Sequence, residues 1–339
     1  MKMSEFVRTL PKLHKAMPIL SFPSASLIGK SVYDLTHDAA VQAEGIVRVA
    51  QEVNSAAAVT VMDLSLEAEA FGATVVASEH EVPTVVGALL SAEEDGVEGA
   101  DALAVPAVGA GRTGVFLDAA ALAKKKIVEK PLFAGIIGPF SLAGRLMDVS
   151  EALVNCLCEE DFVHAVLKKT TAFLTSYAKA YKDAGLDGIL LAEPLAGLLS
   201  PELEAEFSGQ YVKEIVDAVQ DDDFVVIYHN CGPNTPLMVD SLVENGAAVY
   251  HFGDAVDLVL LLEKMPRDIP VCGNISPSAE FLNGTPESIY AATRELVETC
   301  KGYENFVLSS GCDIPPAAPW ENIRAFFKAC EDVYRECEL

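Results

Sequence analysis

Residues 224–233 read Phe-Val-Val-Ile-Tyr-His-Asn-Cys-Gly-Pro. The apolar start of this run predicts a buried strand, and the strand ends at His229 and Cys231. Side chains two positions apart on an extended chain point the same way, so both residues can reach one metal ion. A second apolar run, residues 306–309, leads to Cys312. If the two strand ends meet, their imidazole and two thiols form a three-ligand zinc site with one open position.

Similar apolar runs recur along the chain, and each is followed by a helical pattern. They lie near residues 19, 59, 135, 189, 225, 248, 271 and 307. Strands buried on both faces and separated by helices predict a parallel sheet. An open doubly wound sheet would place a glycine-rich phosphate turn after its first strand, and residues 23–26 contain no glycine. We therefore predict an α/β fold, a (β/α)8 TIM barrel forming one domain over residues 1–339.

Some elements of this barrel can be predicted more closely. Residues 1 to about 17 are expected to form an N-terminal helical arm. Residues 73–115, with short apolar pairs at 75–76 and 85–86, are predicted to form a lid or hairpin insertion. Helices are predicted at residues 38–54, 149–182 (two helices, the second beginning at Asp161), 201–219 (capped by Ser200), 238–246, 257–264, 285–300 (capped by Thr285) and 320–336.

The composition excludes several classes of partner. The chain has 50 acidic and 24 basic residues and a formal net charge of −26. This charge argues against nucleic acid and anionic membranes, and we interpret the short run Lys124-Lys125-Lys126 as a solvated surface. The uncharged runs contain Gly and Pro and are too short to span a bilayer. The N-terminus carries early charges in place of an apolar signal segment, so we expect a cytoplasmic protein.

The chain has eight cysteines, and in a cytoplasmic protein they are not expected to form a disulfide framework. Five of them fall in helical patterns and Cys272 falls inside a strand, where a small buried side chain is the ordinary interpretation. Only Cys231 and Cys312 stand at the ends of strands beside glycine. These two are therefore the candidates for chemistry.

The catalytic residues of such barrels lie at the carboxyl ends of the strands. Beyond the three zinc candidates, Glu193 could serve as a ligand or support one, and Asp63 could face the pocket or cap the helix predicted after it. Asn274, Ser276 and His251 are candidates for a cofactor-binding surface, although a hydrogen bond to a backbone carbonyl would also explain His251. The predicted catalytic set is His229, Cys231, Cys312, Glu193 and Asp63.

Several motifs resemble a known family. They are Phe22-Pro23 and residues 62–72, 138–144, 229–232 and 310–316, spread over nearly the whole chain. The sequence resembles the uroporphyrinogen decarboxylase superfamily and, within it, the zinc-dependent corrinoid methyltransferases that act on coenzyme M. The His-x-Cys pair with a distant cysteine distinguishes those methyltransferases from the decarboxylases. The resemblance implies that His229, Cys231 and Cys312 bind Zn²⁺, and that a partner corrinoid protein supplies a methylated corrinoid (cobalamin).

One departure from the decarboxylases decides between the two activities. They carry an arginine-rich segment after the first strand that holds the carboxylates of a tetrapyrrole, and residues 21–30 contain no arginine. We therefore exclude decarboxylation and expect methyl transfer from a corrinoid protein to a small thiol, with coenzyme M as the expected acceptor. The sulfonate of coenzyme M would need a cation or a helix N-terminus, and Arg112 and Arg145 are the candidates.

Two alternatives stay open. One is an O-demethylase-type methyltransferase that moves a methyl group from a methoxylated substrate to a corrinoid protein. The other is a non-catalytic paralogue that binds a corrinoid or a metal as an accessory subunit. The intact set of candidate ligands argues against the second.

Overall fold

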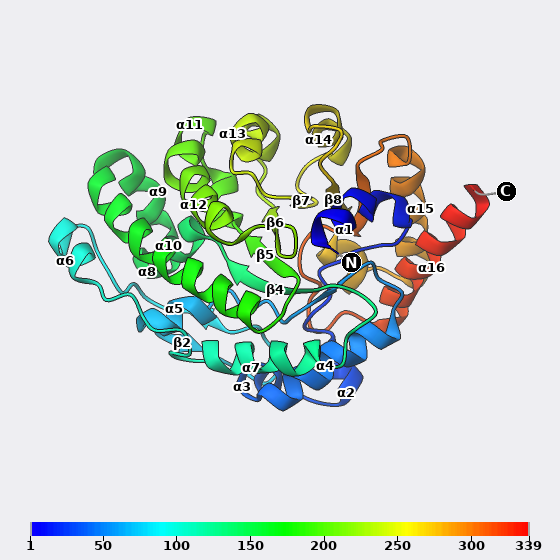
Figure 1. Ribbon diagram of the computed structural model, residues 1–339, viewed down its shortest axis with the longest axis horizontal. Helices are drawn as coiled ribbons and strands as arrows, with labels where there is room; N and C mark the ends of the chain where they lie inside the picture. The colour runs from blue at the N-terminus through cyan, green and yellow to red at the C-terminus, as the bar shows by residue number, and fades with distance from the viewer. Residues whose placement is uncertain (1, 338–339) are drawn as a thin grey trace.

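A sheet of seven parallel strands forms the centre of the protein (Figure 1), in a computed structural model that describes residues 2–337. The order across the sheet is β1-β4-β5-β6-β7-β8-β9. The strands are β1 (Ala58–Val59), β4 (Leu132–Ile137), β5 (Gly188–Ala192), β6 (Val225–Asn230), β7 (Val249–Phe252), β8 (Val271–Ile275) and β9 (Phe306–Ser310). Helices surround the sheet, as they do in a TIM barrel, and the predicted fold class is confirmed.

The strand predicted near residue 19 is not a regular strand. Residues 16–20 nevertheless run between β9 and the residues before β1, because Met17 N donates to Leu308 O (2.8 Å) and Ala56 N donates to Ala16 O (2.9 Å). Pro18 has no N–H to donate, and Ile19 N donates to the Ser310 hydroxyl instead of to a carbonyl. The segment therefore occupies the eighth position of the barrel without a continuous ladder of backbone hydrogen bonds.

Most predicted helices are confirmed, with their predicted caps. The long helices are α4 (Ala39–Glu52), α9 (Val149–Cys158), α10 (Glu160–Asp183), α12 (Gln210–Val219), α15 (Pro286–Cys300) and α16 (Trp320–Cys337), and the shorter predicted ones are α5 (Leu66–Phe71), α11 (Pro201–Glu204), α13 (Val239–Glu244) and α14 (Leu258–Lys264). Ser200 Oγ accepts from Leu203 N, and Thr285 and Ser288 form a capping box. Both helices begin with proline, as the sequence predicts.

Five helices were not predicted: α2 (Ser24–Ile28), α3 (Val32–His37), α6 (Gly96–Ala102), α7 (Thr113–Lys124) and α8 (Pro139–Met147). The apolar run near residue 135, predicted as a strand, continues past the end of β4 at Ile137, and α8 starts two residues later. Pro139 occupies the first turn of α8, where its missing N–H costs no hydrogen bond. The apolar character of α8 conceals this boundary, because strand and buried helix are both continuous apolar runs.

Two apolar layers lie on the two faces of the sheet. The inner layer fills the barrel and includes Leu190, Ala192, Val225, Ile227 and Val307. At one end of the barrel, α1 (Met3–Thr9) and the turn η1 (Leu10–Leu13) complete this layer with Met3, Phe6 and Leu10, as the predicted N-terminal helical arm. Ser4 N donates to Asp222 O before β6, so this arm covers the amino ends of the strands. The carboxyl ends of the strands are not covered by this arm, so a functional site can form there.

Residues 73–115 contain a small antiparallel hairpin, β2 (Val75–Val76) with β3 (Thr84–Val85), followed by α6. Leu89 N and Leu90 N both donate to Leu146 O, which ties this segment to the end of α8. In Figure 1, α6 lies at the outer edge of the molecule. A role for the segment as a lid stays a prediction.

Among residues 2–337, no helix combines the length and the apolar character needed to cross a membrane.

Candidate metal centre

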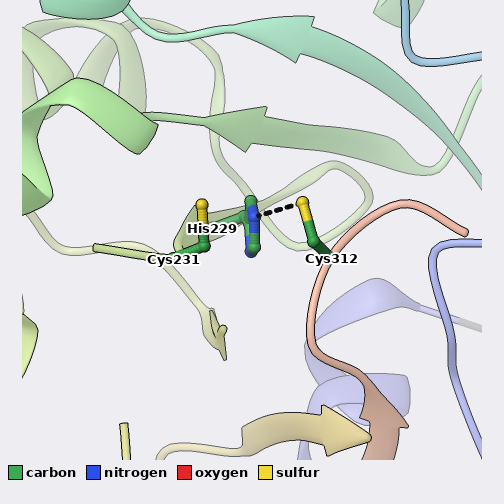
Figure 2. A group of neighbouring side chains, drawn as sticks. All are labelled: His229, Cys231 and Cys312. Atoms are coloured by element: carbon green, nitrogen blue, oxygen red, sulfur yellow. Dashed lines mark hydrogen bonds between the residues drawn. The ribbon is translucent and has the colours of Figure 1, made fainter. Parts of the chain in front are cut away.

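Three side chains from two distant segments converge at the carboxyl ends of β6 and β9. The ligand atoms of His229, Cys231 and Cys312 all lie within 4.8 Å of one another. Figure 2 shows His229 and Cys231 at the end of β6 and Cys312 on the segment after β9. His229 follows the inward-facing Val225 and Ile227 at intervals of two residues, so strand alternation points it into the barrel. The structure thus brings together the three residues predicted as metal ligands.

One pair of donor atoms in this cluster has the separation expected in a tetrahedral zinc site. With Zn–N near 2.0–2.1 Å and Zn–S near 2.3 Å, tetrahedral angles place a nitrogen and a sulfur ligand about 3.5 Å apart. His229 Nε2 and Cys312 Sγ are 3.5 Å apart. The donors, one imidazole and two thiols, are also those that zinc prefers. These three residues could therefore hold the ion and leave a fourth position for a substrate.

A chain of buried hydrogen bonds orients the His229 ring. His229 Nδ1 is 2.8 Å from His251 Nδ1, and His251 Nε2 is 2.7 Å from Ser309 Oγ. The Ser309 hydroxyl donates to Met17 O at 2.8 Å, so it must accept from His251 Nε2–H. Burial, together with the nearby His229, holds the pKa of His251 well below its usual value, and a neutral His251 then accepts at Nδ1.

This assignment fixes the tautomer of His229. Its Nδ1 carries the proton that is donated to His251, and its Nε2 presents a lone pair toward Cys312. A metal-binding histidine in proteins is commonly held in this way through its other nitrogen. His251 is fully buried behind His229, and its predicted role in cofactor binding stays a prediction. The sequence did not identify Ser309, because no local pattern links residues 229, 251 and 309.

The two thiols are coupled. A hydrogen bond with Cys312 lowers the pKa of Cys231. The same bond, reinforced by burial, raises the pKa of Cys312 to about 12. Metal ligands of this type bind as thiolates, so binding of a divalent cation would release protons from this pair.

Two glycines shape the space around the cysteines. A Cβ on Gly253 would lie 2.5 Å from Cβ of Cys231, and a Cβ on Gly311 would lie 2.7 Å from the backbone nitrogen of Asp254. The residues after β7 thus pass close to both Cys231 and the segment that carries Cys312. Any larger side chain at either glycine would push the ligand segments apart.

Glu193 does not join the cluster. It follows Ala192, which faces the barrel interior, so alternation turns Glu193 toward the helices. Its Oε1 accepts from Ser141 N at 2.5 Å near the start of α8, and its Oε2 has no hydrogen-bond partner among the described residues. Burial raises the pKa of Glu193 to about 8. A Cβ on Gly138 would overlap this carboxyl, which explains a glycine there.

Asp63 also faces the helical layer. Its carboxylate accepts from Ser65 N at 2.9 Å and pairs with the buried guanidinium of Arg112. Arg112 also pairs with Glu69 and donates to Ser65 Oγ. Asp63 therefore holds the start of α5 and the segment before α7, and Arg112 is fully engaged in this network.

Asn274 and Ser276 perform local structural tasks after β8. Asn274 Nδ2 donates to Gly253 O and Val256 O, both at 2.9 Å, and so holds the loop that passes Cys231. Ser276 Oγ accepts from Ala279 N at the start of the helical turn η5 (Pro277–Leu282). Within residues 2–337, neither side chain hydrogen-bonds to the three-ligand cluster, and their role in cofactor binding stays a prediction.

The fold and the site agree with a comparison to protein families. The sequence matches the family described as uroporphyrinogen decarboxylase (URO-D) over residues 7–333. The chain belongs to this family.

The relatives of this chain include both methyltransferases and, at 24–28% identity over 226 residues, uroporphyrinogen decarboxylases. The chain is 30% identical over 277 residues to the methylcobamide:CoM methyltransferase MtbA of Methanosarcina mazei, covering 80% of this chain and 78% of that protein. It is 28% identical over 274 residues to MtbA of Methanosarcina acetivorans, with the same coverage. A solved methyltransferase from Methanosarcina mazei superposes with a TM-score of 0.84 at 23% identity, covering 98% of this chain and 99% of that one. The superposition supports the fold, and the named sequence relatives confirm the predicted enzyme class, a methyltransferase.

The buried carboxyl of Glu193 predicts a pH dependence of stability. Its pKa of about 8 lies above the ordinary 4.5, so the folded chain keeps a proton that the unfolded chain releases between these values. Stability therefore falls as pH rises through this window, by at most about 1.4 kcal/mol per pH unit from this group. Glu193→Gln, which mimics the protonated carboxyl, should make the fall from pH 5 to pH 8 shallower in urea unfolding.

The control for this measurement is Glu93→Gln, at an exposed carboxyl, which should follow the wild-type profile. The buried Glu67, whose pKa burial also raises to about 8, remains in both variants and retains part of the slope. Identical slopes for Glu193→Gln and the wild type would contradict the prediction.

Proposed function

We propose that this protein is a zinc-dependent methyltransferase that moves a methyl group from a methylated corrinoid protein to a small thiol, with coenzyme M as the expected acceptor. The observation that carries the proposal is the cluster of His229, Cys231 and Cys312 at the carboxyl ends of the barrel strands. The names of the relatives, methylcobamide:CoM methyltransferases, support the donor and the acceptor.

In this proposal the protein binds the metal ion and positions the acceptor thiol. His229 Nε2 and the sulfurs of Cys231 and Cys312 would hold Zn²⁺, and the hydrogen bond with His251 would keep His229 Nε2 unprotonated and oriented for this role. Bound zinc supplies one thing, the lowering of a thiol pKa so that the acceptor sulfur is a nucleophile at neutral pH. Two thiolates and a neutral imidazole cancel the charge of Zn²⁺, so the ligands do not make the site cationic. The barrel mouth then aligns the acceptor sulfur with the methyl group.

The acceptor thiol and the methylated corrinoid are the only reactants that the methyl transfer requires. The acceptor thiol loses its proton to solvent, and its sulfur attacks the methyl carbon of the corrinoid. A carbon–sulfur bond forms as the carbon–cobalt bond breaks, and the electron pair of that bond stays on cobalt. The products are a thioether and a cob(I)alamin-type corrinoid.

Methyl transfer is tested directly with methylcobalamin as a substitute for the methylated corrinoid protein. The zinc-loaded enzyme is incubated with 2-mercaptoethanesulfonate and a panel of other thiols, and cob(I)alamin is followed by its absorbance. We expect cob(I)alamin to form with 2-mercaptoethanesulfonate, and the rate to fall at least 100-fold in Cys312→Ala, which lacks one metal ligand.

The other outcomes favour the alternatives. Activity on methoxylated aromatic compounds without activity on any thiol would identify an O-demethylase-type methyltransferase. A zinc-loaded protein that is inactive in every assay would favour an accessory, non-catalytic role.

Metal content is a second, independent prediction. The purified wild-type protein should contain about one zinc per chain by elemental analysis, because three ligand atoms already lie within 4.8 Å of one another. Cys312→Ala should lose most of this zinc. Cys158→Ala, which removes an exposed cysteine far from the cluster in sequence, should keep it. A wild-type protein without zinc after growth in zinc-supplemented medium would rule out the proposed centre.

The hydrogen-bond chain behind His229 makes a third prediction. His251→Ala removes the acceptor of His229 Nδ1–H, so the ring loses its fixed orientation, and zinc affinity should fall about 10- to 100-fold. Affinity is measured by competition with a chromogenic chelator, and the visible spectrum of the Co²⁺-substituted protein reports ligand geometry. His251→Gln, which can accept from His229 and donate to Ser309, should recover part of the loss. Wild-type affinity in both variants would show that His251 does not orient the ligand.

A further inference from the structure

A cavity of about 500 Å³ lies next to the segment that follows Cys312. It is bounded by the end of β1, the β2–β3 hairpin, the end of α8 and the segment after β9. Its lining includes Phe22, Met62, Glu81, Arg145, Asp313 and Pro315. Because Asp313 directly follows Cys312 in the chain, the cavity borders the segment that carries a proposed zinc ligand.

Arg145 contributes the only Lys or Arg side chain to this lining. It is half-buried, and within residues 2–337 its guanidinium has no hydrogen bond or ion pair. Arg112, the other arginine that the sequence suggested, has its donors committed to Asp63, Glu69 and Ser65. An arginine with open donors at the wall of a cavity is free to bind a ligand.

The two carboxylates of the lining do not neutralise Arg145. Both oxygens of Asp313 accept from the Ser21 hydroxyl, at 2.9 and 2.8 Å. Glu81 is exposed on the hairpin, and neither carboxylate forms an ion pair with Arg145. The remaining walls at Phe22 and Met62 are apolar and suit a short hydrocarbon chain. The cavity thus combines apolar walls with one guanidinium group, that of Arg145.

We propose that Arg145 is the residue that binds the acid group of the methyl acceptor and so selects acidic over neutral thiols. This inference rests on the proposed function and names the residue that recognises the substrate at the same site. A guanidinium can donate two parallel hydrogen bonds to the oxygens of such a group, which a neutral thiol lacks. The acid end lies at Arg145 and the sulfur is directed toward the cysteine-bearing segment.

Binding is measured first, because it does not require turnover. Isothermal titration compares 2-(methylthio)ethanesulfonate, a thioether product with an acid group, with neutral 2-(methylthio)ethanol. In Arg145→Gln the affinity for the sulfonate should fall about 10- to 100-fold relative to the wild type, which is typical of a lost charge-assisted hydrogen bond. Arg145→Lys should recover part of it, and Arg48→Gln, at an exposed arginine of α4, should bind as the wild type does.

Kinetics then resolve which acid the site accepts. With methylcobalamin as donor, 2-mercaptoethanesulfonate, 3-mercaptopropionate and homocysteine are compared with neutral 2-mercaptoethanol. In Arg145→Gln the ratio of kcat/KM for the preferred acidic thiol to that for 2-mercaptoethanol should fall by about tenfold or more, mainly through KM. A sulfonate preference identifies a coenzyme M-like acceptor, and a homocysteine preference identifies an amino-acid thiol.

The failures of the two proposals are distinguishable. Absence of transfer to every thiol overturns the proposed function, whereas the role of Arg145 is still decided by the titrations. Equal affinity of Arg145→Gln and the wild type for the sulfonate, or equal losses for charged and neutral ligands, would overturn the role of Arg145.

Discussion

The hydrogen-bond chain from His229 through His251 and Ser309 to Met17 O is the interaction on which the candidate centre depends. It joins β6, β7 and β9 to the segment in the eighth barrel position. Each polar atom in it is buried, and a buried donor or acceptor left without a partner costs about 1–3 kcal/mol. The closing segment therefore stabilises the barrel and also sets the direction of the His229 lone pair.

The two faces of the sheet separate two kinds of polar group. His229, His251 and Ser309 lie on the inner face, in phase with the apolar residues that fill the barrel. Glu193 and Asp63 lie on the outer face, where they bind backbone N–H groups or an arginine near the starts of helices. The carboxyls thus hold the loops of the mouth in place, and the nitrogen and sulfur donors meet inside it. This division keeps the proposed metal ligands free of carboxylates.

The mouth also has two sides. The metal ligands come from the ends of β6 and β9, while the cavity with Arg145 lies toward β1, α8 and the β2–β3 hairpin. In our proposals the first side activates sulfur and the second recognises the rest of the acceptor. The segment after β9 belongs to both, because Cys312 and Asp313 are consecutive.

The sequence was sufficient for the features that depend on short segments. Apolar runs identified the seven strands, since a parallel strand buried on both faces needs such a run. Ser200 and Thr285 marked helix starts because a capping bond spans three residues. The boundary between β4 and α8 and the irregular segment at Pro18 were predicted wrongly, since apolar composition alone does not separate a strand from a buried helix or show a broken ladder.

The residue set His229, Cys231 and Cys312 was predicted from the sequence alone, through ligand chemistry and position at strand ends, and the structure brings the three side chains together. Only the tertiary structure decided the surroundings. It turned Glu193 and Asp63 away from the site, because the phase of strand alternation relative to the barrel axis is set by packing of the whole sheet. It placed His251 behind His229. Within residues 2–337 it left the Arg145 guanidinium at a cavity without an ion pair, whereas Arg112 pairs with Asp63 and Glu69. Those outcomes depend on contacts between residues far apart in the chain, and no local pattern encodes them.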